Sequence, residues 1–136
     1  MDITFESSEK LYNDLVKLVQ TNEAFYTTEQ ELDGVQYIIF NYRMASYTDF
    51  CQAGALNARG TMFEVYNGNF IRLVCLPFAK FFNLGETPFT MDLDLSDVDY
   101  IADKMDGSMI CSYLHTDKLS GEKILKLKTK GSISSD

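Results

Sequence analysis

The residues best suited to chemistry form one short run, Lys104-Met105-Asp106-Gly107-Ser108. A lysine amine can attack a phosphorus atom when desolvation or nearby positive charge lowers its pKa. Asp106 can orient the lysine or the turn through its carboxylate, and Gly107 lets the backbone come close to a phosphate or a sugar. An ordinary Asp-Gly hairpin beside a solvated lysine has the same K-x-D-G pattern, so the rest of the chain must decide between them.

The first part of the chain predicts one helix and one strand. Apolar residues recur at helical spacing over residues 8–21, with Ser7 or Ser8 as the N-cap. The polar and acidic stretch 21–34 indicates a loop. Residues 35–42 are β-branched and aromatic and predict a strand, and a Ser followed by Asp at 46–49 indicates the start of a short helix.

The remainder predicts antiparallel hairpins. Asn67-Gly68 is the favoured two-residue hairpin turn, and turns are also expected at Asp106-Gly107 and Ser120-Gly121. The expected β segments are residues 61–66, 70–75, 98–102, 109–114 and 123–130. In the last of these, Lys alternates with Leu, which indicates one wet face. The fold class is therefore α+β, with residues 1–136 forming one domain.

Composition excludes several classes of protein. Apolar residues make up 46% and include ten Phe and eight Tyr, which is enough for a core and argues against disorder. No apolar stretch approaches the roughly 18 residues that span a bilayer. The three cysteines include no C-x-x-C pair and His115 is the only histidine, so no metal site is expected. We predict reduced thiols, a cytoplasmic protein and an exposed His115.

Charge is distributed unevenly along the chain. Residues 1–110 hold 7 Lys and Arg against 17 Asp and Glu, whereas residues 111–136 hold 5 Lys against 3 acids. Binding to nucleic acid needs cations that neutralise phosphates. Because the net charge is −8, we expect any polyanion to be held locally rather than by the whole surface.

Several segments in order resemble the ATP-dependent RNA ligases, in particular the phage RNA ligase 1 family used in tRNA repair. The matching segments are 42–49, 58–64, 80–84, 88–91, 97–100, the run 104–108 and 128–133. The resemblance covers nearly the whole chain and implies a nucleotidyltransferase (ATP-grasp-like ligase) domain. It also implies ATP, Mg²⁺ on the triphosphate, RNA ends such as nicked tRNA, and the cytoplasm of a phage-infected bacterial cell.

The same resemblance implies a role for each matching residue. Lys104 would attack the α-phosphorus of ATP, AMP would pass to an RNA 5′-phosphate, and a 3′-hydroxyl would then displace AMP. Arg59 would contact phosphate or ribose oxygens, as its forked donors suit, although a strand-edge arginine paired with an acid is the simpler alternative. Lys80 would hold a phosphate.

For three further residues, the sequence leaves alternative roles open. Phe82 would form a pocket wall or support a base, and plain core packing explains it equally well. Lys130 would face nucleotide or RNA phosphates, and Lys128, two residues earlier on the same face, is an alternative contact. Both lysines also fit a solvated face of an edge strand.

The family's later motifs, which include two glutamates and a pair of lysines, do not follow Gly131-Ser132 in this sequence. We therefore expect these residues alone to adenylylate poorly or not at all, as a fragment, a truncated product or one half of a split enzyme. Unpaired sheet edges would invite a C-terminal half or self-association. The alternative function is a non-catalytic remnant acting as a binding module. A small acidic phage inhibitor of host proteins fits the charge but leaves the Lys104 motif unexplained.

Overall fold

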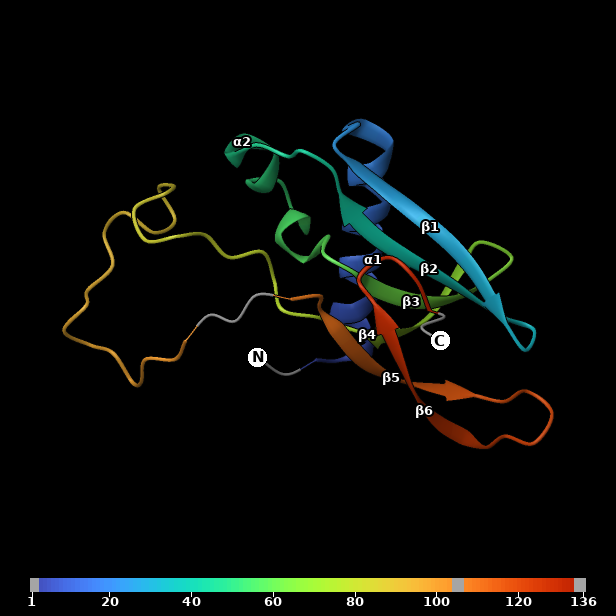
Figure 1. Cartoon of the computed structure of the whole chain (residues 1–136). Coiled ribbons are helices and arrows are strands. Elements are labelled where there is room, and N and C mark those ends of the chain that lie inside the picture. Colours follow the sequence, from blue (N-terminus) through green and yellow to red (C-terminus); the bar gives the residue numbers. More distant parts are fainter. Residues whose placement is uncertain (1–2, 104–106, 134–136) are drawn as a thin grey trace.

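The computed structural model describes residues 3–103 and 107–133 and has the predicted α+β class. One helix lies against a four-stranded antiparallel sheet, and a two-stranded antiparallel sheet lies against the opposite face (Figure 1). The elements are α1 (Phe5–Thr21), β1 (Phe25–Leu32), β2 (Val35–Tyr42), α2 (Tyr47–Phe50), a 3-10 turn (Ala55–Asn57), β3 (Thr61–Tyr66), β4 (Asn69–Cys75), β5 (Ile110–Thr116) and β6 (Lys123–Thr129). None of the helices in these ranges is long and apolar enough to cross a membrane.

Helix α1 begins earlier than predicted because Thr4, not Ser7 or Ser8, is its N-cap. The Thr4 hydroxyl accepts a hydrogen bond from the Ser7 amide at 3.1 Å, and the Ser7 hydroxyl accepts one from the Thr4 amide at 2.9 Å. This reciprocal pair satisfies two amides that the helix itself leaves without acceptors. The buried side chains of α1, which include Leu15 and Leu18, then pack on the four-stranded sheet.

The expected loop at 21–34 is wrong, because residues 25–32 form β1 at the edge of the sheet. β1 pairs with β2 along its full length, from Phe25 opposite Tyr42 to Leu32 opposite Val35. Its polar residues are tolerated because one face of an edge strand is wet. The missed signal was Asp33-Gly34, a favoured hairpin turn in which both residues have positive φ, 51° and 81°.

The other elements of the four-stranded sheet follow the sequence pattern. β2 has the predicted bounds, α2 is capped by Ser46, and Asn67-Gly68 joins β3 to β4. The strand order is β1-β2-β3-β4, so each strand lies beside its neighbour in sequence. β2 is buried on both faces: Ile38 and Phe40 lie in the core beneath α1, and Tyr37 and Ile39 lie in the core beneath β5 and β6.

Between β4 and β5 the chain leaves the body of the molecule as a long outward excursion, coloured yellow to orange in Figure 1. The predicted strand at 98–102 is not formed. Val98, Tyr100 and Ile101 are 47%, 83% and 90% exposed, so their side chains are not packed against a neighbouring strand or a core. Local β propensity alone does not form a strand without such packing.

The two-stranded sheet reverses the expected orientation of β6. Its outward face is apolar, with Leu114, Leu125 and Leu127 exposed, whereas its inward face carries Tyr113, His115 and Lys128, all buried. The predicted wet lysine face is therefore wrong for Lys128. Tertiary packing decided the orientation, because the surface beneath supplies apolar contacts for Tyr113 and polar partners for His115 and Lys128.

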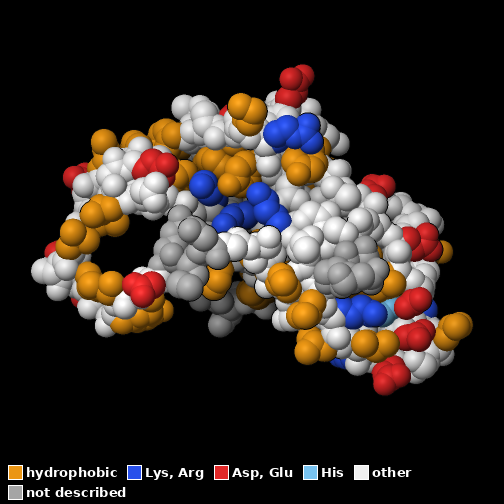
Figure 2. Space-filling view, viewed as in Figure 1, with side chains coloured by type: hydrophobic (Ala, Val, Ile, Leu, Met, Phe, Trp, Pro, Cys, Tyr) orange, Lys and Arg blue, Asp and Glu red, His pale blue; other side chains and the backbone are white. Residues whose placement is uncertain are grey.

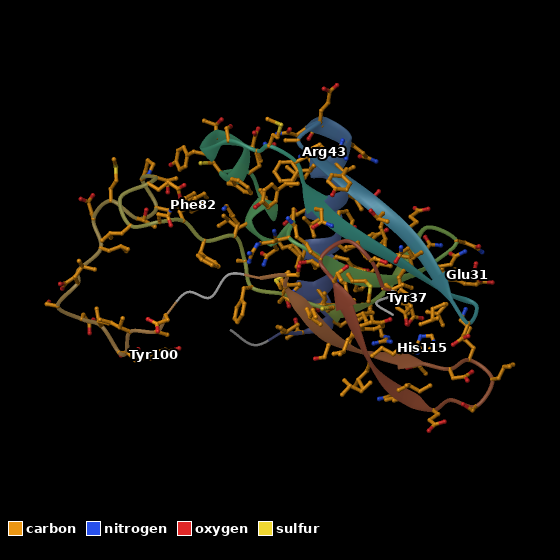
Figure 3. All side chains as sticks on the ribbon, viewed as in Figure 1. Glu31, Tyr37, Arg43, Phe82, Tyr100 and His115 are labelled. Carbon is orange, nitrogen blue, oxygen red and sulfur yellow. The ribbon has the colours of Figure 1, made fainter. Side chains whose placement is uncertain are left out.

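His115 is wholly buried, which corrects the expectation of an exposed histidine. Its Nδ1 lies 2.6 Å from the Tyr37 hydroxyl, and its Nε2 lies 3.3 Å from Asp33 Oδ2 without hydrogen-bond geometry. Figure 3 shows Tyr37 and His115 near one another, at the junction of the two sheets. The pair joins β2 to β5 through a polar contact next to the core that lies beneath β5 and β6.

Stability is expected to fall steeply above about pH 10, the ordinary tyrosine pKa. Burial raises the pKa of Tyr12, Tyr37 and Tyr113. A group whose pKa is higher in the folded state stabilises fully below its unfolded pKa and loses that contribution as pH rises through the folded value. Urea unfolding at pH 8, 10 and 11 measures the slope, and Tyr37→Phe should flatten it. An unchanged slope in that variant would contradict the assignment.

Candidate functional site

Three segments singled out in the sequence meet at one end of the four-stranded sheet. Gly60 immediately precedes β3, and its amide donates to the Phe40 carbonyl at 2.9 Å. A Cβ added to Gly60 would lie 3.2 Å from the Lys130 carbonyl oxygen, so the chain after β6 passes directly over this glycine. The Lys80 amide donates a hydrogen bond to the Leu56 carbonyl at 2.7 Å, so the segment around Lys80 lies against the one that precedes Gly60.

Lys130 lies at the mouth of this junction. Its ammonium is 4.8 Å from the centroid of the Tyr42 ring, and its side chain is partly exposed. Its carbonyl accepts a hydrogen bond from Asn41 Nδ2 at 3.1 Å. Asn41 is 1% exposed, and its Oδ1 has no hydrogen-bond partner in the described part of the chain. Sequence reasoning missed Asn41, because a polar residue near the end of a strand carries no local signal of burial.

Lys128 takes a different position from Lys130. It is fully buried, and its ammonium donates to the Gly60 carbonyl at 3.0 Å and to the Thr129 carbonyl at 2.7 Å. Burial lowers the pKa of Lys128, while the nearby Cys75 and Cys111 thiols act in the opposite direction. Its ammonium therefore holds the backbone around Gly60 in place. Of the two alternative phosphate contacts, Lys130 is the one that a ligand could reach.

The turn after β6 is fixed to β1 by Gln30. Its Oε1 accepts from the Ile133 amide at 2.7 Å, and its Nε2 donates to the Ser132 hydroxyl at 3.4 Å. The Thr129 amide donates to the Ser132 carbonyl at 3.0 Å and closes the turn itself. Lys130 and Gly131 are therefore held on a short anchored turn.

Arg59 and Lys80 belong to the segments that form this junction, and the side chain of each lies beside an aromatic ring. The Arg59 guanidinium lies 5.3 Å from the centroid of Phe81, and the Lys80 ammonium lies 5.2 Å from that of Phe82. Such cation–π contacts hold a cation without neutralising it. The alternative of Arg59 paired with an acid is not seen, because no carboxylate lies within ion-pair distance in the described ranges.

Phe82 is partly buried and also packs against the core that lies beneath α1. Its ring lies 5.7 Å from that of Phe50 in an edge-to-face arrangement and stacks on Phe89 at 5.6 Å. Plain packing therefore accounts for most of its contacts. The Lys80 ammonium also lies beside its ring, and Figure 3 shows Phe82 at the start of the long excursion.

We call Arg59, Lys80 and Lys130 the cationic cluster. In Figure 2, Lys and Arg side chains gather in a hollow near the centre of the visible face, between the long excursion and the sheet. Because carboxylates do not neutralise these cations within residues 3–103 and 107–133, the cluster suits a polyphosphate or a nucleic-acid backbone. It is a local exception in a chain of net charge −8, and two of its three residues come from the acidic part, residues 1–110.

Lys104 and Asp106 lie outside the described residues. Gly107 is described: it is exposed, its φ is 151°, and a Cβ there would meet nothing within 4 Å. That backbone conformation favours glycine, in agreement with the need expected for it at this position.

The described residues do not by themselves fit a protein-bound Mg²⁺. Within 3–103 and 107–133, no group of three His, Cys, Asp or Glu side chains could hold a metal ion. Mg²⁺ is commonly carried on substrate phosphates with one or two carboxylates.

No model of a known protein family matches this chain.

Proposed function

We propose that this chain carries the adenylyl-accepting segment of an ATP-dependent RNA ligase, with Lys104 as the nucleophile. The observation that supports this best is the meeting of Arg59, Lys80 and Lys130. They come from three segments that are far apart in sequence and that were each chosen for their resemblance to such ligases. An accidental set of matches would not be expected to converge in space.

In the proposed reaction, the unprotonated amine of Lys104 forms a bond to the α-phosphorus of ATP. The bond between that phosphorus and the bridging oxygen breaks, pyrophosphate leaves, and the amine loses a proton. Such transfers depend on positioning and on stabilising negative charge. The cationic cluster would supply part of that stabilisation, and Gly107 would let backbone come close to the nucleotide. The AMP would then pass to a 5′-phosphate of RNA.

A second candidate is a binding module built on the same fold. It is favoured by one observation: the cationic cluster is complete without Lys104. Binding of a polyphosphate or an RNA end needs only charge and shape, whereas adenylylation also needs an activated amine.

The test is the intact mass of the protein after incubation with ATP and Mg²⁺. We expect a small fraction of the parent to gain the mass of one AMP, because such ligases use further glutamates and lysines. Lys104→Ala should gain none, and Arg59→Ala should gain at least about tenfold less, a loss typical of one missing stabilising contact. Lys17→Ala, which changes an α1 lysine that makes none of the site contacts, is the matched control and should behave like the parent.

An adduct that persists in Lys104→Ala would overturn the assignment of the nucleophile. If no variant forms an adduct but ATP raises the melting temperature of the parent and not of Arg59→Ala, the binding module is the better function. An absence of both effects would overturn both candidates.

A further inference from the structure

Two cysteines from different sheets meet at the edge of a cavity. Cys75 is the last residue of β4, and Cys111 is the second residue of β5. Cys111 packs against the core cluster that contains Cys75, and the two thiols interact. Both residues also line a cavity of about 830 Å³ that extends along α1 and the start of the long excursion. Ile3, Phe78 and Ile110, which are 58%, 81% and 59% exposed, also line this cavity, so it is open to solvent.

The two thiols differ in their surroundings. Cys75 is 6% exposed, and burial raises its pKa to about 11, so it remains a thiol at neutral pH. Cys111 is partly exposed. It faces Lys128 across the strand pair, and the buried Lys128 ammonium interacts with both sulfurs. Cys111 is the more accessible of the two thiols, so it is the one that a solute entering the cavity meets first.

We propose that Cys75 and Cys111 form a reversible disulfide when the protein meets a hydroperoxide. The Cys111 thiolate attacks the peroxide, an S–O bond forms, the O–O bond breaks, and hydroxide or alkoxide leaves. Cys75 sulfur then attacks the resulting sulfenic acid at sulfur and loses its proton, and water leaves as the S–S bond forms. The peroxide gains two electrons, and each sulfur supplies one. A dithiol reductant reverses the reaction by thiol–disulfide exchange.

This disulfide would close the segment 76–110 into a loop and tie the two sheets together. That segment carries Lys80, Phe82 and the Lys104 motif, so oxidation restricts the part of the chain that the proposed function uses. The disulfide does not require that function, because the packing of the two cysteines and the cavity that reaches them involve neither ATP nor RNA. Cross-linking constrains the unfolded chain and is expected to raise the melting temperature by several degrees.

The experiment uses Cys51→Ser as the parent, because Cys51 is exposed and would otherwise cross-link molecules to one another. Reduced protein is treated with hydrogen peroxide, unfolded, and alkylated with N-ethylmaleimide before its intact mass is measured. We expect a monomer that has lost two hydrogens and takes up no label, and dithiothreitol should restore two labelled thiols. Peptide mapping should link Cys75 to Cys111.

Cys51→Ser/Cys111→Ser is the matched control, and it should keep one alkylatable thiol after the same treatment. Two labelled thiols after peroxide would overturn the proposal. A disulfide found only between molecules, or only in protein that was unfolded before oxidation, would overturn it equally. A melting temperature that does not rise on oxidation would contradict the closure of the loop.

Discussion

Lys128→Ala is expected to lower the free energy of unfolding by about 2–4 kcal/mol. The substitution removes the donor that satisfies the Gly60 and Thr129 carbonyls, and each buried unsatisfied group costs about 1–3 kcal/mol. It also empties the space of a fully buried four-carbon stem. Removing a desolvated charge offsets part of this loss. Urea unfolding at neutral pH measures the result.

Two further variants make the Lys128 test specific. Lys126→Ala changes the preceding inward-facing lysine of β6, which is partly exposed, and should cost no more than about 0.5 kcal/mol. Lys128→Met keeps most of the stem and removes only the donor, so the gap between Met and Ala reports the packing. Equal urea midpoints for Lys128→Ala and Lys126→Ala would refute the buried role of Lys128.

Gly60→Ala is expected to cost about 2–4 kcal/mol of stability and to displace Lys130 from the cationic cluster. At φ +90°, a Cβ is strained by about 1–2 kcal/mol. It would also lie 3.2 Å from the Lys130 carbonyl oxygen and 3.4 Å from the Lys130 Cα, both backbone atoms that cannot rotate away. The AMP adduct proposed for the parent should fall with the stability.

Gly68→Ala separates the backbone strain at positive φ from the steric contact with the Lys130 backbone. Gly68 has a similar φ of +78°, but a Cβ there meets nothing within 4 Å, so only the backbone strain applies and about 1 kcal/mol is expected. The difference between the two alanine variants measures the approach of the β6 turn to Gly60. Equal losses would mean that the turn moves aside freely.

Much of the fold could be predicted where local and tertiary preferences agree. The β3–β4 hairpin combines β-branched and aromatic residues with Asn67-Gly68, and β2 has an unbroken apolar run over residues 37–40 because both of its faces are buried there. β1 was missed because its residues Thr27 to Glu31 are polar, and its pairing depends on the partner strand. The strand predicted at 98–102 is not formed for the opposite reason: the segment has the local pattern of a strand, but no partner strand in the described part of the chain pairs with it.

The candidate site was harder to predict than the fold. Arg59 and Lys130 were found by their resemblance to a family, and no local pattern places them together. Lys128 and His115 were misjudged because a charged or polar residue in a short strand normally faces water. Both are buried where hydrogen-bond partners lie across the two sheets: the Gly60 carbonyl for Lys128 and Tyr37 for His115.

The consecutive strand order of the four-stranded sheet sets an expected sequence of folding events. β1 to β4 are each joined to the next strand by a connection that is short or itself compact, so their contacts are local and form quickly. β5 and β6 can dock only after the ends of the segment 76–109 have come together, which costs entropy that grows slowly with loop length. We therefore expect residues 5–75 to form the early kinetic nucleus. Substitutions of Tyr113 or His115 should then speed unfolding and leave the rate of folding nearly unchanged.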